Sequence, residues 1–183
     1  MTETLLAPPR VDLKSAASGI GRLLKNKDDT EAVFVIMRAL SGKAVQKGYA
    51  RLMRTAKGGQ IAYDRVELQP LLDDHTALRG LPEGSVGRAY LDFVQVRAFS
   101  ADGLADESRK VGRSEIDARH PVAWYARRLR DIHDLWHVLT GYSTDALGEV
   151  CVVAFSHAQT RSSGFALIAL AGGRELARGL PGY

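Results

Sequence analysis

Cysteine and long apolar runs are both scarce in this 183-residue chain, and each shortage excludes a class of protein. Cys151 is the single cysteine, so an internal disulfide framework is excluded and a reducing compartment is favoured. No apolar run approaches the roughly 20 residues that a membrane-spanning helix needs. The segment from Met1 to Arg10 has neither the apolar core of a secretory signal nor an arginine-rich transit pattern. We therefore expect a bacterial cytoplasmic protein.

The charge and the length predict a small globular domain that does not bind nucleic acid. The formal net charge of +4 is mild, and basic residues are not interleaved with aromatic ones as in proteins that stack bases. A chain of 183 residues can bury about two thirds of its unfolded surface. We expect residues 1–10 to form a flexible N-terminus and residues 11–183 to form one helical domain.

Apolar residues recur at helical spacing between glycine, proline and capping residues, which predicts an all-α, single-domain helical bundle. The expected helices cover residues 11–26, 31–40, 44–56, 61–68, 85–98, 121–139, 145–159 and 165–176. The run 33–36 follows an Asp29 or Thr30 cap and would equally suit a buried strand, but we favour a helix. Residues 105–117 are expected to form a loop or an exposed helix.

Helix boundaries are clearest around residues 120–145. Pro121 suits the first position of a helix, with His120 before it as a weak cap. Gly141 can take the left-handed conformation that ends this helix. Ser143 or Thr144 can then cap the next helix, with Asp145 in its first turn.

Two histidines at helical spacing and a later glutamate form the most informative pattern in the chain. His133 and His137 stand four residues apart, and Glu149 follows twelve residues after His137. Because four residues make just over one turn, both imidazoles project from one face, at a separation that one ion can span. The same face carries an apolar stripe of Val122, Tyr125, Ala126, Leu129, Ile132 and Trp136. The histidines should therefore face inward, and a returning carboxylate would complete a three-ligand metal site with room for water or substrate.

The helix that carries Glu149 is apolar nearly all round, so we expect it to be buried. A carboxylate inside such a helix costs several kcal/mol, roughly, unless a cation or a donor meets it. A hairpin of helices 121–139 and 145–159 would bring Glu149 to the two histidines. A single inward histidine is more often a hydrogen-bonded core residue than a ligand, but the joint pattern favours a metal. His75, His120 and His157 have no partner at ligand spacing and are read as structural or surface residues.

Asp134 has two readings that the sequence leaves open. It lies about a quarter turn from the histidine face, where it can ligate the metal or act as a base. It also follows Arg130 by four residues, so the two can form an ion pair on the helix.

The motif His-Asp-x-x-His, eleven residues and Glu resembles the coenzyme Q (ubiquinone) biosynthesis protein family number four. The segment 81–87, Leu-Pro-Glu-Gly-Ser-Val-Gly, followed by Tyr90 and Phe93, is similar to a second motif of that family. Residues 133–141 and then Thr144, Leu147, Gly148, Glu149, Phe155, Gln159 and Thr160 follow the family signature in order. Ser156 is a departure, because many mitochondrial members carry an acidic residue there.

The resemblance implies an all-helical fold with a metal site between two adjacent helices, formed by His133, Asp134, His137 and Glu149. It implies a divalent metal, zinc first and iron or manganese as alternatives. The implied activity is decarboxylation, or oxidative decarboxylation, of a prenylated hydroxybenzoate. We expect Asp134 to be the catalytic residue, which orients a ligand or moves a proton. The implied partners are a prenylated quinone precursor and other ubiquinone-biosynthesis enzymes, with the inner-membrane surface and a second copy of the chain as further candidates.

Two other functions fit the same residues. The first is a scaffold that binds a prenyl lipid and partner enzymes around a structural metal. The second is a metallohydrolase, since His-Asp-x-x-His resembles the metalloprotease helix with aspartate in place of the usual glutamate. We rank the hydrolase last, because aspartate is one methylene shorter and the Leu-Pro-x-Gly segment matches no such family.

A row of basic residues bears on membrane binding. Lys43, Lys47, Arg51 and Arg54 lie on one face of the expected helix 44–56, and apolar residues lie on another. Such a helix can rest on anionic lipid, although a solvated face over an ordinary core stripe is the more common meaning of this pattern.

Overall fold

The computed structural model describes residues 10–26, 29–97 and 119–179. These residues form eleven α-helices and, within the same ranges, no strand, so the all-α prediction is confirmed. The helices are α1 (Leu13–Lys25), α2 (Thr30–Ser41), α3 (Ala44–Leu52), α4 (Ala56–Asp64), α5 (Gln69–Asp73), α6 (His75–Arg79), α7 (Val86–Arg97), α9 (Pro121–Asp131), α10 (His133–Thr140), α11 (Ala146–Thr160) and α12 (Ser163–Gly179). The expectations for residues 1–9 and 105–117 lie outside the described residues.

Several helix boundaries differ from the sequence-based expectation. The expected helix 121–139 is divided at Ile132, whose backbone (φ −81°, ψ −2°) leaves regular helical geometry between α9 and α10. Neither glycine nor proline marks this position. Gly58 and Gly59 lie between the expected helices 44–56 and 61–68 but are inside α4, because the Thr55 side chain accepts from Gly58 N–H and starts that helix. Pro70 follows the expected helix 61–68 and lies in the first turn of α5, where a missing N–H costs nothing.

Other predicted boundaries are confirmed. Asp29 caps α2, and the segment 33–36 is helical rather than a strand. His120 Nδ1 accepts from the N–H of Val122 at the start of α9, directly before Pro121. The expected helix 85–98 begins as α7, where Ser85 Oγ accepts from Arg88 N–H.

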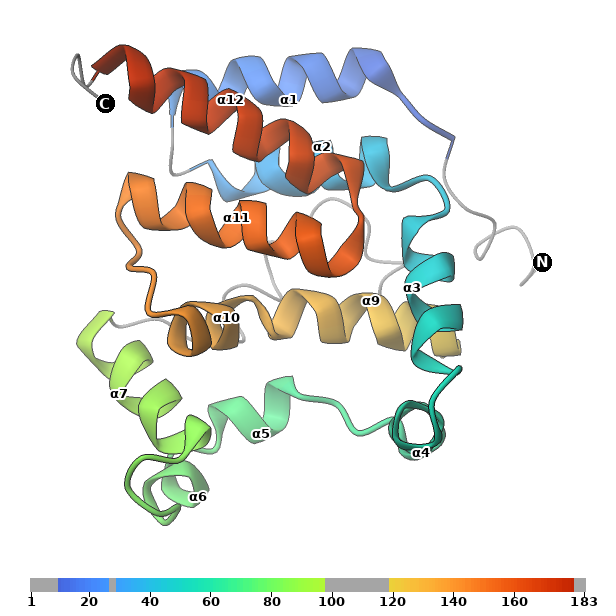
Figure 1. Cartoon of the computed structure of the whole chain (residues 1–183), viewed down its shortest axis with the longest axis vertical. Coiled ribbons are helices and arrows are strands. Elements are labelled where there is room, and N and C mark those ends of the chain that lie inside the picture. Colours follow the sequence, from blue (N-terminus) through green and yellow to red (C-terminus); the bar gives the residue numbers. More distant parts are fainter. Residues whose placement is uncertain (1–9, 27–28, 98–118, 180–183) are drawn as a thin grey trace.

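The helices are stacked in layers (Figure 1). Helices α1, α2 and α12 pack together at one end, and α11 lies between α12 and the consecutive helices α9 and α10. Helix α7 packs against α10 from the other side and also contacts α6. None of the helices in the described part of the chain combines the length and the apolar character that crossing a membrane requires.

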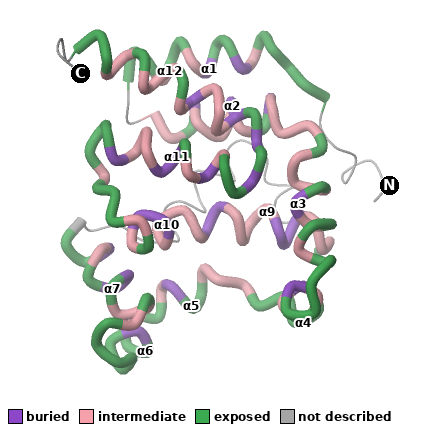
Figure 2. The backbone as a smooth tube through the Cα atoms, viewed as in Figure 1, coloured by how far each residue is buried: buried purple, intermediate pink, exposed green. Residues whose placement is uncertain are grey.

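Three apolar clusters hold these layers together, and the buried positions lie on the helix faces that meet (Figure 2). Ile36 of α2 packs with Val153 of α11 and Ile168 of α12. Trp124 and Tyr125 of α9 join α4 and α3. The third cluster is formed by Leu72, Leu78, Tyr90, Leu91 and Val94, with Phe93, Leu135 and Val138 packed against it. This cluster fixes α7 against α10, the helix that carries both histidines of the motif.

Candidate metal centre

A tight return between α10 and α11 brings the motif residues together. Gly141 ends α10 with φ +73°, the left-handed conformation expected for it. Asp145, rather than Ser143 or Thr144, caps α11 by accepting from the N–H groups of Leu147 and Gly148 at 2.9 Å each. A side chain on Gly148 would overlap the backbone of Ser143, so the close return at this point requires glycine.

His133, His137 and Glu149 form a three-donor cluster between α10 and α11. His137 Nε2 lies 3.4 Å from Glu149 Oε1, and His133 Nε2 lies 3.7 Å from Glu149 Oε2. One donor atom from each residue lies within 4.8 Å of the others. A tetrahedral ion with bonds of about 2.1 Å places its ligand atoms about 3.4 Å apart, so a small contraction would let the three residues hold one ion.

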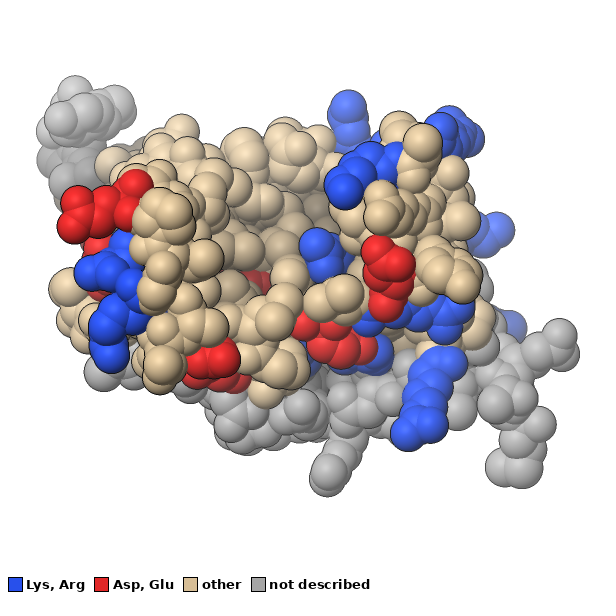
Figure 3. Space-filling model, turned by 90° about the horizontal axis from the view of Figure 1, so that it is seen from below, with Lys and Arg blue, Asp and Glu red and all other residues tan. Residues whose placement is uncertain are grey.

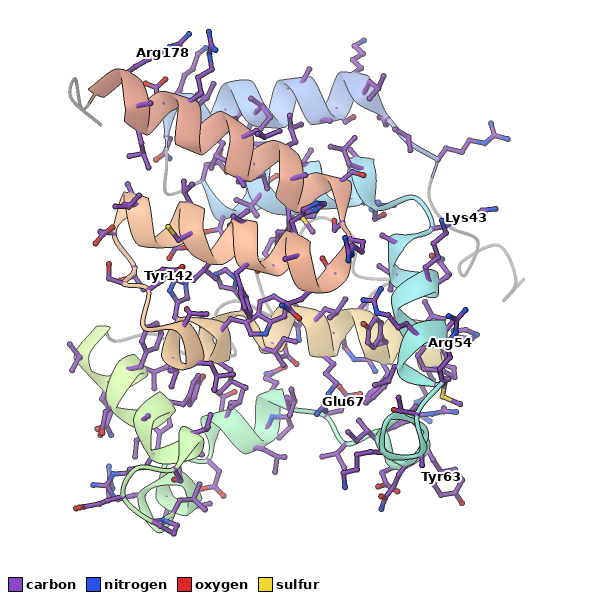
Figure 4. The ribbon with its side chains drawn as sticks, viewed as in Figure 1. Lys43, Arg54, Tyr63, Glu67, Tyr142 and Arg178 are labelled. Carbon is purple, nitrogen blue, oxygen red and sulfur yellow. The ribbon has the colours of Figure 1, made fainter. Side chains whose placement is uncertain are left out.

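The second ring nitrogen of His137 has a partner in the turn after α10. His137 Nδ1 lies 3.0 Å from the carbonyl oxygen of Tyr142, to which it can donate. Figure 4 shows Tyr142 in the connection between α10 and α11. With the proton on Nδ1, a neutral ring would keep the lone pair of Nε2 for an ion placed between His137 and Glu149, as metal-binding histidines require.

Phe93 of α7 supports the same ring from outside the hairpin. Its ring is stacked on that of His137, with centroids 5.5 Å apart and an interplanar angle of 25°. The rings of His133 and His137 meet edge to face, with centroids 5.1 Å apart. Phe93, from the second motif, therefore meets the histidine motif at the three-donor cluster although the two are far apart in the sequence.

Contacts within the cluster set its charges. Burial disfavours the charged form of Glu149, but the nearby His133 and His137 rings outweigh it and lower the pKa of this carboxyl to about 2. Burial also disfavours a charged His137, yet Glu149 and the Tyr142 carbonyl raise the pKa of this ring above its usual value. The cluster thus holds an ionised carboxylate that favours the charged form of the His137 ring beside it.

The exposure of the three donors is unequal. The side chain of His137 is 1 % exposed, that of His133 is 24 % exposed and that of Glu149 is 43 % exposed. The expectation that Glu149 lies buried in an apolar helix is therefore wrong, since its place in the first turn of α11 leaves one side open. Leu147 of the same turn is also exposed.

Asp134 lies beside the cluster and is not one of its three donors. Burial raises the pKa of its carboxyl, with the two histidines opposing that effect and Glu149 adding to it. Asp134 is also the charge that most strongly supports the raised pKa of Tyr90, after burial of that phenol. Arg130, the alternative partner of Asp134, instead donates to Asp131 at 2.6 Å. This buried pair takes the place of the ion pair between Arg130 and Asp134, which was the second reading of Asp134.

An open pocket of about 400 Å³ adjoins the cluster. Its lining combines apolar and polar residues from α7, α10 and the following turn: Ala89, Asp92, Phe93, His137, Val138, Gly141, Tyr142 and Ser143. A small molecule in this pocket would lie against residues of the same helix end that carries His137.

The basic row lies away from the three-donor cluster. Lys43 stands at the start of α3 and Arg54 just beyond its end, both along the outer edge of that helix (Figure 4). All four basic residues are exposed, and Arg51 also donates to the carbonyl of Gln159 at 2.7 Å. Seen from below, many of the visible Lys and Arg side chains gather on the half of the molecule that carries α4 (Figure 3).

Sequence comparison places the whole described chain within one family. The model of the coenzyme Q (ubiquinone) biosynthesis protein Coq4 matches residues 10–179. The mitochondrial ubiquinone biosynthesis protein COQ4 homologue of Bos taurus is 34 % identical over 145 residues, and that of Homo sapiens is 32 % identical over the same length. These alignments cover 79 % of this chain and 52 % of each relative, so the chain spans about half the length of the curated relatives that it matches.

These comparisons correct one expectation and establish the family. The relatives from Bos taurus, Homo sapiens and Mus musculus are all named as mitochondrial proteins, which points to mitochondria and contradicts a bacterial cytoplasmic protein peripheral to the inner membrane. The resemblance read from the two motifs is confirmed. Because the family model covers nearly all of the sequence, the chain belongs to the Coq4 family of coenzyme Q (ubiquinone) biosynthesis proteins.

Proposed function

We propose that this chain is a metal-dependent protein of ubiquinone biosynthesis that removes the ring carboxylate of a prenylated hydroxybenzoate. The observation that carries the proposal is the three-donor cluster, in which Glu149 lies 3.4 Å from His137 Nε2 and 3.7 Å from His133 Nε2. Family membership supports the pathway, and the open pocket beside His137 supports access by a substrate.

Two imidazoles and one carboxylate suit zinc first, with iron or manganese as alternatives. When bound by His133, His137 and Glu149, such an ion supplies positive charge that stabilises the electron density developing as carbon dioxide leaves. Structural zinc sites are usually closed by four protein donors, whereas catalytic sites keep a position open. The three donors found among the described residues and a half-exposed Glu149 therefore favour the catalytic reading over a scaffold with a structural metal.

The residues around the cluster have separable tasks. Ala89, Phe93 and Val138 offer an apolar wall to the ring or the first part of a prenyl tail. In the redox-neutral step, the bond from the ring to the carboxyl carbon breaks, its electrons stay on the ring carbon, and a proton replaces carbon dioxide. We assign Asp134 to move this proton or to orient a ligand. An oxidative version would also need dioxygen and an electron source, and we do not propose it.

Metal content tests the donor set. Purified protein should hold about one divalent ion per chain, and His137→Ala should lose the ion together with part of its thermal stability. Elemental analysis of wild type, His137→Ala and the control His157→Ala checks this. His157 is a matched control because it also lies in the last turn of its helix but is outside the three-donor cluster. Equal metal content in all three proteins would contradict the assignment.

A further inference from the structure

Helices α10 and α11 end in the same type of turn. In each, a histidine is followed three residues later by a threonine and then by a residue with positive φ. In α10 these are His137, Thr140 and Gly141 (φ +73°); in α11 they are His157, Thr160 and Arg161 (φ +61°). The N–H of the left-handed residue donates to the histidine carbonyl in both turns, at 2.9 Å and 2.8 Å.

The threonine side chain ties both ends of each turn. Thr140 Oγ1 donates to the Trp136 carbonyl at 2.7 Å and accepts from Tyr142 N–H at 3.4 Å. In the second turn, Thr160 Oγ1 donates to the Ser156 carbonyl at 2.7 Å and accepts from Ser162 N–H at 3.2 Å. The hydroxyl thus holds the residue after the left-handed one against the end of the helix.

That held residue is the partner of the histidine. Its carbonyl oxygen lies 3.0 Å from His137 Nδ1 in the first turn and 2.9 Å from His157 Nδ1 in the second. A proton on Nδ1 in this contact leaves a free lone pair on Nε2 of the neutral ring, which can bind a metal ion. Among the described residues, only the first turn directs Nε2 toward other side chains that could bind the same ion, namely Glu149 and His133.

The second turn shows that this geometry does not need a metal site. Since the same hydrogen bonds form around His157, they are a property of the helix end itself. The chain therefore contains a copy of the turn at which the same substitution can be made without touching the three-donor cluster. Comparing the same substitution in the two turns therefore separates a loss of turn stability from a loss of metal affinity.

We infer that Thr140 is a positioning residue for the metal centre, acting through the Tyr142 backbone to hold His137 with its proton on Nδ1 and Nε2 directed at the ion. This inference rests on the proposed metal site. Valine has nearly the shape of threonine but lacks the hydroxyl, so Thr140→Val frees the Tyr142 segment while keeping the helix volume. Substitution of groups that orient metal-binding histidines typically weakens metal affinity about 10–100-fold, and we expect at least tenfold weaker binding here.

The test is a titration of metal-free protein with zinc and with cobalt in competition with a chelator. Thr140→Val should bind each ion at least tenfold more weakly than wild type, and Thr140→Ser, which keeps the hydroxyl, should bind like wild type. Thr160→Val should lose thermal stability similarly to Thr140→Val yet keep wild-type affinity. Equal affinity of Thr140→Val and Thr160→Val would overturn the inference.

A second measurement does not depend on the folding of any variant. Nitrogen-15 resonances of the histidine rings in metal-free wild type report which nitrogen of neutral His137 carries the proton. A proton on Nδ1 supports the inference, and a dominant proton on Nε2 overturns it. Failure of wild type itself to bind metal, or unchanged binding by His137→Ala, would instead overturn the proposed metal site.

Discussion

At the scale of single residues, Asp134 and His137 have distinct places although both belong to α10. His137 is held from three sides by Glu149, the Tyr142 carbonyl and the Phe93 ring. Asp134 lies outside the three donors, where burial raises the pKa of its carboxyl. In the proposed metal site, Asp134 would lie near the ion without holding it, which is the position of a proton-transfer group.

Replacing Asp134 by asparagine should therefore separate metal binding from turnover. Asp134→Asn keeps the size of the side chain and removes its acid, so metal content and melting temperature should stay near wild type. In a host that lacks its own family member, the variant should fail to restore ubiquinone, and a still-carboxylated prenylated precursor should accumulate.

One outcome would contradict this role of Asp134, and one variant serves as the control. Full restoration of ubiquinone by Asp134→Asn with normal metal content would favour the scaffold function. The His157→Ala protein serves as the control for expression and should restore ubiquinone as wild type does.

At the scale of helices, capping side chains decide where the elements begin. Asp29 accepts from Ala32 N–H at 2.9 Å and also receives two hydrogen bonds from Arg22 of α1. The Ala32 N–H and then the Arg22 guanidinium lower the pKa of this carboxyl below its ordinary value. One side chain thus starts α2 and ties it to α1.

The pH dependence of stability tests this dual role of Asp29. Because its pKa is lowered on folding, the ionised form stabilises the protein fully above the unfolded pKa of about 3.9, and this contribution is lost as the pH falls through the folded value. Asp29→Asn keeps a capping oxygen but lacks the charge that pairs with Arg22. Its melting temperature should lie below that of wild type at neutral pH and converge on it toward about pH 3.

Asp29→Ala provides the comparison for the cap. It removes both the cap and the ion pair, so it should be less stable than Asp29→Asn at every pH. Equal melting temperatures of the two variants would show that the cap contributes nothing.

At the scale of the whole molecule, the basic row and the metal centre lie on different elements. The row follows the outer edge of α3, while the centre lies between α10 and α11 and opens beside α7. A protein acting on a prenylated precursor would need to reach a lipid surface, and exposed Lys and Arg attract anionic headgroups.

Binding to anionic vesicles tests the basic row. Lys43→Glu/Lys47→Glu should reduce flotation with vesicles that contain phosphatidylserine, as should added salt, because each basic residue near such a surface contributes roughly 1 kcal/mol. Arg51 is left unchanged, since it also binds the Gln159 carbonyl. Arg174→Glu/Arg178→Glu on α12 is the matched control and should float like wild type. Insensitivity of flotation to both the first substitution and salt would make the row an ordinary solvated face.

The sequence by itself determined those features that depend on neighbouring residues. The spacing of His133 and His137 places two imidazoles on one face of any helix, and Gly141 ends that helix because glycine accepts positive φ. Capping by Asp29 and the proline start of α9 are equally local. The return of Glu149 was predictable because so few residues connect the two helices.

Only the tertiary structure decided the features that depend on contacts between distant segments. The stacking of Phe93 on His137 follows from how α7 packs against α10, and the burial of the Arg130–Asp131 pair follows from how the other helices cover α9. The division of the expected helix at Ile132 likewise has no glycine or proline to announce it. Periodicity shows which face of a helix is apolar, but the partner that covers each position of that face is chosen by packing across the fold.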